Sequence, residues 1–136
     1  MDRTTDLHWM RKALALAENG RWNTAPNPRV GCIIVHEGVS IAEGWHAQLG
    51  GAHAEVHALG KLEPSDERLS SSTAYVTLEP CNHHGRTPPC TALLMDRGVR
   101  RIVVGMKDPD PRVAGSGIHR LRAGGAQVTV LDDQLG

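Results

Sequence analysis

Two short stretches of this sequence hold the residues best suited to metal chemistry. Residues 77–90, TLEPCNHHGRTPPC, contain two of the three cysteines, and the triplet HAE at residues 53–55 lies upstream. Imidazole and thiolate groups are common zinc ligands, and a catalytic zinc takes three protein ligands and keeps a fourth position open. We therefore interpret His53, Cys81 and Cys90 as candidate ligands of a catalytic zinc ion.

The carboxylate of Glu55, two positions after His53, is the candidate proton carrier. Zinc lowers the pKa of water to about 7. A carboxylate that lies beside the metal without binding it can then move protons between water and a substrate. The helix N-termini expected at these positions favour thiolate over thiol. This set of residues predicts a hydrolytic reaction at neutral pH.

The hydrophobic pattern predicts the elements that place these residues. Helices are expected over residues 5–19, 53–62, 88–97 and 118–123, and strands over 30–36, 39–45, 73–77, 101–106 and 127–131. The first helix has an expected apolar face made by Leu7, Met10, Leu14 and Ala17, and residues 64–72 are expected to form a loop. A hairpin followed by alternating strands and helices predicts a mixed sheet with helices on both faces.

Composition narrows the class of protein. The 136 residues suit a single domain, and no apolar run is long enough to span a membrane. Fifteen basic and fifteen acidic residues give a formal net charge of zero, and aromatic residues make up 3%. Both features argue against a nucleic-acid partner. The odd number of cysteines does not form a disulfide framework, so we expect a cytoplasmic protein.

The combination HAE…EPC…PPC matches the H-x-E…P-C signature of the zinc nucleobase deaminases, except that eight residues separate the two cysteines where two are usual. Residues 77–90, together with APNPRVGCIIV, GAHAEVHAL and DPDPRVAGSG, resemble the deaminase domain of the bifunctional riboflavin-biosynthesis deaminase/reductase family. The resemblance covers about residues 5–131. It implies a cytidine-deaminase-like three-layer α/β/α fold with a five-stranded mixed sheet and one zinc ion per chain.

The resemblance also implies a reaction and partners. The substrate would be 2,5-diamino-6-(5-phosphoribosylamino)pyrimidin-4(3H)-one, and its 2-amino group would leave as ammonia in the second step of riboflavin biosynthesis. A homodimer or higher homo-oligomer is expected, with neither a membrane nor a nucleic-acid partner. Residues 1–136 are expected to form a single deaminase domain without a reductase domain. The chain would then be either a monofunctional deaminase, with a separate reductase as a possible partner, or one domain of a longer product.

Carried over by residue, the resemblance makes His53, Cys81 and Cys90 the zinc ligands and Glu55 the proton shuttle. The expected substrate-binding residues are Asn27 for the pyrimidine, Asp108 for the ribose, and His46, His83 and Arg86 at the substrate side of the metal. Candidates for holding the phosphate are Arg86, Lys107 and Arg112. Simpler interpretations remain for several of these, since Asn27 could cap a turn and the two histidines and Arg86 could be loop residues.

Two positions depart from the family pattern. Asn82 stands where serine is common, and Asp110 stands where asparagine is usual. The added negative charge of Asp110 keeps open a deaminase of another small heterocycle, such as a nucleobase, a nucleoside or a specialised-metabolite pyrimidine. A nucleic-acid deaminase, a zinc-dependent RNA-binding module and an inactive scaffold are less favoured hypotheses for the same residues.

Overall fold

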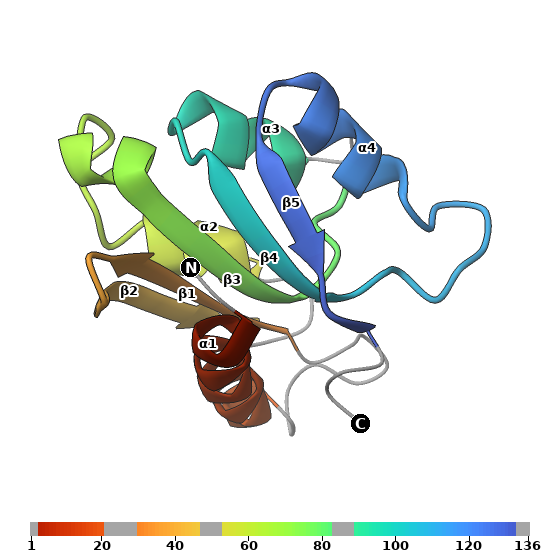
Figure 1. Cartoon of the computed structure of the whole chain (residues 1–136), viewed down its shortest axis with the longest axis horizontal. Coiled ribbons are helices and arrows are strands. Elements are labelled where there is room, and N and C mark those ends of the chain that lie inside the picture. Colours follow the sequence, from red (N-terminus) through yellow and green to blue (C-terminus); the bar gives the residue numbers. More distant parts are fainter. Residues whose placement is uncertain (1–2, 21–29, 47–52, 83–88, 133–136) are drawn as a thin grey trace.

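The computed structural model describes residues 3–20, 30–46, 53–82 and 89–132. Within them, five strands form one sheet in the order β2-β1-β3-β4-β5 (Figure 1). The strands are β1 Gly31–His36, β2 Val39–Trp45, β3 Ser72–Leu78, β4 Arg101–Met106 and β5 Gln127–Val130. The α-helices are α1 Arg3–Ala17, α2 Ala54–Leu59, α3 Cys90–Asp96 and α4 Ser116–Ala123, and short 3-10 helices are η1 Glu18–Gly20 and η2 Glu67–Ser71.

The sheet is mixed, as the sequence predicts. Strand β1 pairs antiparallel with β2 and β3, whereas β3, β4 and β5 run parallel to one another. The carboxyl ends of the parallel strands therefore meet at one edge of the sheet, which is where open α/β sheets place their ligands. The residues that follow β3 and β4 in the chain emerge at this edge.

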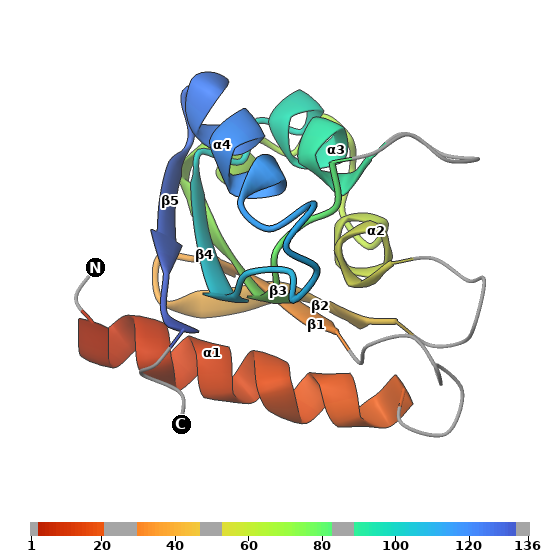
Figure 2. The same ribbon diagram turned by 90° about the vertical axis from the view of Figure 1, so that its right-hand side faces the viewer.

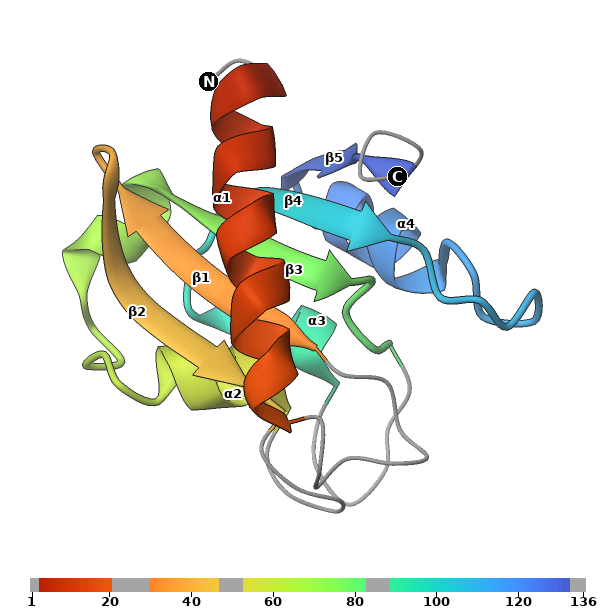
Figure 3. The same cartoon turned by 90° about the horizontal axis from the view of Figure 1, so that it is seen from below.

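Helices cover both faces of the sheet and complete the three layers. Among the described helices, α1 crosses one face of the sheet (Figure 3), and α2, α3 and α4 lie on the opposite face (Figure 2). Because strand side chains alternate in direction, Ile33 and Tyr75 pack on the α1 side, while Cys32, Ile34 and Val76 pack on the other side. Cys32 is fully buried in this core.

The buried face of α1 differs from the predicted one. Met10, Ala13 and Ala17 are buried, but Leu14 is 39% exposed. The helix is rotated relative to the expected apolar face, and the rotation buries the polar residue Asp6. Its carboxylate accepts a hydrogen bond from the Tyr75 hydroxyl at 2.8 Å and two from the Arg101 guanidinium at 3.1 and 2.7 Å.

Several other details also differ from the sequence interpretation. Helix α1 already begins at Arg3, α2 ends at Leu59 instead of residue 62, and the expected loop over residues 64–72 contains η2. The side chain of Asp66 caps η2 by accepting from the backbone N–H of Arg68. Among the described residues, no helix is long and apolar enough to cross a membrane.

Candidate metal centre

Three chain segments bring the predicted zinc ligands to the carboxyl edge of the parallel strands. His53 is the N-cap residue of α2, and Cys90 is the first residue of α3, directly after the N-cap Pro89. Cys81 follows the end of β3 by three residues. The expectation that two neighbouring helix N-termini meet over one sheet is confirmed.

The ligand atoms of His53, Cys81 and Cys90 all lie within 4.8 Å of one another. The Nδ1 atom of His53 is 3.3 Å from the Cys90 Sγ and 3.8 Å from the Cys81 Sγ. Zinc bond lengths of about 2.3 Å to sulfur and about 2.0 Å to nitrogen place two tetrahedral ligand atoms about 3.6 Å apart. The residues present therefore fit a zinc ion bound through one imidazole and two thiolates.

The two cysteines differ in their tendency to ionise in the metal-free chain. A hydrogen bond from the Cys90 thiol lowers the pKa of Cys81, and the same bond together with burial raises the pKa of Cys90. The backbone N–H of Cys90 also donates to the Cys81 Sγ at 3.2 Å. In the metal-free chain the N-terminus of α3 thus stabilises the sulfur of Cys81, and burial favours the thiol form of Cys90.

Glu55 lies in the first turn of α2 and is only 4% exposed. Burial raises its pKa to about 7, and the nearby thiolate of Cys81 adds to this shift, while the imidazole of His53 opposes it. A carboxyl group that titrates near neutral pH is suited to both accepting and giving up a proton. A dication beside it would lower this pKa by favouring the carboxylate.

His46 follows the end of β2 and lies beside the metal ligands. It is 7% exposed, and its ring centroid is 5.6 Å from that of His53. His46 therefore lies beside a proposed metal ligand, and its role as a substrate contact stays a prediction. Asn27, His83 and Arg86, the other predicted substrate residues in loops, lie outside the described residues.

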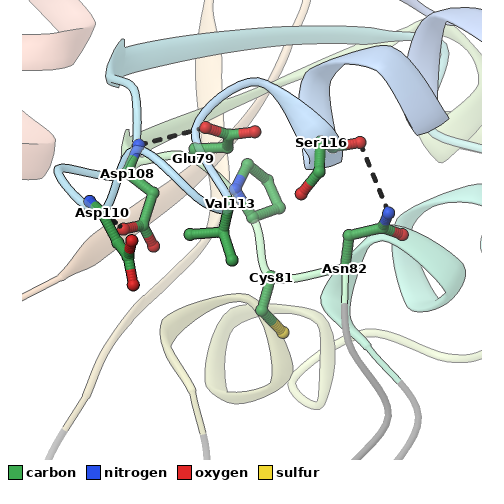
Figure 4. Close-up of a pocket in the computed structure, with 8 residues that line it drawn as sticks. Glu79, Cys81, Asn82, Asp108, Asp110, Val113 and Ser116 are labelled. Carbon is green, nitrogen blue, oxygen red and sulfur yellow. Dashed lines mark hydrogen bonds between the residues drawn. The ribbon is translucent and has the colours of Figure 1, made fainter.

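A pocket of about 450 Å³ opens beside Cys81 (Figure 4). One wall is the segment after β3, with Glu79, Pro80, Cys81 and Asn82, and the other is the segment after β4, with Asp108, Asp110, Val113 and Ser116. The expected ribose-facing residue Asp108 therefore lies in the same pocket as a metal ligand. Among its described lining residues there is no lysine or arginine.

Two of the phosphate candidates, Lys107 and Arg112, are sequence neighbours of residues that line this pocket. The guanidinium of Arg112 pairs with the Asp110 carboxylate at 2.9 Å, and that pair offsets the negative charge that Asp110 adds. Lys107 is exposed. These positions place Arg112 and Lys107 on the same segment as Asp108, beyond the end of β4.

Sequence reasoning missed Glu79, which lies two positions before Cys81. Its carboxylate is 6% exposed and accepts hydrogen bonds from four backbone N–H groups. Burial alone would raise the pKa of Glu79, but these donors hold it below its ordinary value. The sequence shows a glutamate in the TLEPC stretch, but it does not show its hydrogen-bond partners, which lie 29 to 39 residues later in the chain.

Strand β2 sets the position of α2 and therefore of His53 and Glu55. The backbone N–H of Trp45 donates to His57 Nδ1 at 3.0 Å, which gives this histidine a structural contact. A Cβ atom on Gly44 would lie 2.4 Å from the backbone nitrogen of Ala58, so only glycine allows the strand and helix to approach this closely.

Comparison with known proteins agrees with this geometry. Residues 3–106 match the family described as the cytidine and deoxycytidylate deaminase zinc-binding region. The chain belongs to this family of zinc-dependent deaminases, and zinc is the metal for which the three ligands are arranged.

More specific similarities follow within the family. The chain is 52% identical over 124 residues to the riboflavin biosynthesis protein RibD of Escherichia coli K12, which covers 91% of this chain and 33% of that protein. It is 46% identical over 120 residues to the diaminohydroxyphosphoribosylamino-pyrimidine deaminase of Buchnera aphidicola subsp. Acyrthosiphon pisum, which covers 88% of this chain and 80% of that protein. The chain thus spans about a third of the longer curated relatives it matches.

A solved structure shows the same fold. The diaminohydroxyphosphoribosylaminopyrimidine deaminase/5-amino-6-(5-phosphoribosylamino)uracil reductase of Thermotoga maritima superimposes with a TM-score of 0.88 and 40% identity. The alignment covers 97% of this chain and 38% of that one. The three-layer cytidine-deaminase-like fold with a five-stranded mixed sheet is therefore confirmed.

Proposed function

We propose that this chain removes the 2-amino group of 2,5-diamino-6-(5-phosphoribosylamino)pyrimidin-4(3H)-one by hydrolysis. The products are 5-amino-6-(5-phosphoribosylamino)uracil and ammonia. Water supplies the oxygen that replaces the amino group at C2, and the C2–N bond breaks as ammonia leaves. No oxidant or reductant takes part.

One observation carries the choice of substrate. The chain covers four-fifths of a Buchnera relative that is named for this deamination, at 46% identity. The reductase half of the Thermotoga protein is named for the uracil ribotide, which is the product of the proposed reaction. Both names fit a chain in which Cys81, one of the three clustered ligand residues, lines a pocket of about 450 Å³.

The proposed mechanism assigns one role to each group at the site. His53, Cys81 and Cys90 would hold zinc, whose chemistry when bound is to make water a nucleophile at neutral pH. Glu55 would accept a proton from that water and pass it to the ring nitrogen, and it would then carry the proton of the added hydroxyl to the departing amino group. Its buried position in the first turn of α2, the helix that begins at the ligand His53, supports this role.

The pocket beside Cys81 would receive the rest of the substrate. Asp108 accepts the backbone N–H of Asp110 at 2.9 Å through one oxygen, and it lines the pocket where the ribose would lie. Lys107 and Arg112 remain the described candidates for holding the phosphate, together with Arg86. We propose Asn27, His46 and His83 as further substrate contacts on the strength of the family pattern.

A second substrate class is supported by Asp110, which brings a carboxylate to a pocket meant for an anionic ribotide. A deaminase of an uncharged nucleoside or base would tolerate this charge more easily. The ion pair between Arg112 and Asp110 weakens this argument, because it offsets the negative charge of Asp110. The ribotide is therefore the favoured substrate.

An assay on a panel of substrates distinguishes the two substrate classes. Zinc-loaded protein is assayed for ammonia release from the diaminopyrimidinone ribotide, cytidine, guanine and adenosine. The proposal expects turnover of the ribotide with a kcat/KM well above that of the other three. Turnover of another compound without turnover of the ribotide would favour the second substrate class.

The domain organisation, the oligomeric state and the location of the protein are also proposals. We treat residues 1–136 as one deaminase domain, so that reduction of its product is the task of a separate reductase or of a reductase domain in a longer chain. We expect at least a homodimer, and the 43% exposure of Val56 on α2 supports this by offering an apolar side chain for burial. Light scattering after gel filtration measures the mass. A cytoplasmic location without a nucleic-acid or membrane partner stays a prediction.

A further inference from the structure

We propose that Glu79 is a positioning residue that fixes the pocket wall formed by residues 108–116 against the metal-binding segment. The glutamate does not bind the metal and does not face the reacting atoms. It acts through the backbone of the opposite wall. The proposal rests on the function above only for the identity of the substrate.

The contacts of Glu79 divide evenly between its two oxygens. Oε1 accepts from the backbone N–H groups of Asp108 at 3.0 Å and Gly115 at 2.9 Å, and Oε2 accepts from those of Gly117 at 2.8 Å and Ile118 at 3.2 Å. The donors lie at both ends of the wall, so a single side chain fixes where the wall begins and where it ends. Figure 4 shows the bond to Asp108. Hydrogen bonds to a buried carboxylate are among the stronger ones in proteins.

Two of these bonds replace the usual cap of α4. The N-cap residue Gly115 has no side chain, and its φ of 87° lies in the left-handed region that favours glycine. Gly117 and Ile118 are the second and third residues of the helix, whose N–H groups an N-cap side chain would normally satisfy. Glu79 reaches across from the end of β3 and supplies that acceptor, so the start of α4 depends on the metal-binding segment.

Close packing at Gly117 reinforces the same junction. A Cβ atom at this position would lie 2.2 Å from the carbonyl oxygen of Pro80, the residue between Glu79 and Cys81. The start of α4 therefore rests directly on the backbone that leads to a metal ligand. Asn82 adds a link on the other side of Cys81, because its Nδ2 donates to the Ser116 carbonyl at 3.4 Å.

The consequence for the reaction is a fixed distance between two parts of the pocket. Cys81 belongs to the metal end, and Asp108 belongs to the end that would receive the ribose. If Glu79 did not hold the far wall, the metal and the proton carrier would remain in place, but the substrate would meet a looser pocket. Loss of this anchor should therefore raise KM much more than it lowers kcat.

The test uses Glu79→Gln in the zinc-loaded full chain. Whichever way the amide points, its NH₂ group faces two backbone N–H donors, so one pair of hydrogen bonds is lost. Because the pocket wall is then less ordered, we expect KM to rise about tenfold. We expect kcat to stay within about twofold of the wild-type value and the zinc content to stay unchanged. Hydrogen exchange should become faster across residues 108–118 and stay unchanged in β1.

The matched control is Asp6→Asn. Asp6 is also a buried carboxylate that accepts three hydrogen bonds, but it lies on α1 at the opposite face of the sheet. This variant should lose thermal stability without a change in KM. If Glu79→Gln proves insoluble, Glu79→Asp keeps both oxygens on a side chain one methylene shorter, and it should show the same KM effect in weaker form.

Two results would overturn the proposal. One is an unchanged KM in Glu79→Gln, or an equal rise in Asp6→Asn, which would reduce Glu79 to a general stabiliser. The other is unchanged exchange across residues 108–118, a readout that needs no substrate. If the substrate assignment is wrong, the wild-type protein itself will not deaminate the ribotide. The KM values of the wild type and the variants are then compared on the heterocycle that the wild type does deaminate.

Discussion

The backbone N–H of Cys90 donates to the sulfur of Cys81 at 3.2 Å. The helix start that carries one proposed metal ligand thus stabilises the thiolate of the other. Before metal binds, the two sulfurs share a single proton, which the buried Cys90 keeps while Cys81 ionises. Metal binding then has to displace the proton that Cys90 holds, so zinc uptake depends on pH.

This asymmetry predicts which cysteine reacts first in the metal-free protein. After chelation of zinc, iodoacetamide at neutral pH should modify Cys81 well before Cys90, because the thiolate is the reactive form. Cys32, which is fully buried and has a raised pKa, should stay unmodified while the chain is folded. Peptide mass mapping at short times measures the order. Modification of Cys90 first would contradict the assignment, and added zinc should protect both ligands.

Gly44→Ala should weaken zinc binding without touching a ligand. The new methyl would lie 2.4 Å from the Ala58 nitrogen and 2.6 Å from the Ala54 carbonyl oxygen, so α2 must move away from β2 and take His53 with it. We expect a loss of about 2 kcal/mol in stability from this overpacking and a lower zinc affinity in a competition titration.

Gly38→Ala is the control for Gly44→Ala. Gly38 has a φ of 78° and no atom within 4 Å of an added Cβ, so its substitution strains a turn remote from α2. It should cost about 1 kcal/mol of stability. Equal zinc affinities in the two glycine variants would show that the position of α2 does not govern the site.

Asp6→Ala should destabilise the protein by about 2 kcal/mol, since it leaves the Tyr75 hydroxyl and the Arg101 guanidinium without their shared acceptor. Zinc content and kcat should stay at wild-type values, because this network lies under α1 and the metal ligands lie beyond the other face. Denaturant unfolding measures the first quantity and metal analysis the second. Zinc loss in this variant at a temperature where it is folded would contradict the separation of the two faces.

Glu55 gives the metal-free protein a distinctive pH dependence. Burial raises its pKa from 4.5 to about 7, so the folded chain binds a proton that the unfolded chain releases between these values. The unfolding free energy should therefore fall as the pH rises through this range, by an amount on the order of 3 kcal/mol. In Glu55→Gln that part of the fall disappears. Parallel wild-type and variant profiles in urea unfolding between pH 5 and pH 8 would show that Glu55 ionises normally.

Local patterns in the sequence were enough to predict most of the fold. The strand over residues 39–45 has the predicted bounds, because an apolar run after a Glu37-Gly38 turn leaves one hairpin geometry. The metal ligands were also predictable, since their types and order are unusual in combination. The predicted burial of Leu14 is wrong because its apolarity counts toward a helix face, whereas the packing buries Ala13 and the hydrogen-bonded Asp6 instead.

The parts that escaped prediction depend on contacts between distant segments. Glu79 is a polar residue in a motif, and nothing near it in sequence reveals that its hydrogen-bond donors lie at the start of α4. The unequal cysteines depend in the same way on the approach of α3 to the end of β3. In both cases the partner is a backbone N–H group, which every residue but proline carries and which therefore leaves no mark on the sequence.

The most direct test of the account compares zinc content and ammonia release in the wild type and in Glu55→Gln. The account predicts about one zinc per chain in both proteins. It also predicts ammonia release from the diaminopyrimidinone ribotide by the wild type, with a loss of at least about 10²-fold in the variant. A variant that keeps its zinc and releases ammonia at the wild-type rate would contradict Glu55 as the proton carrier, and with it the proposed mechanism.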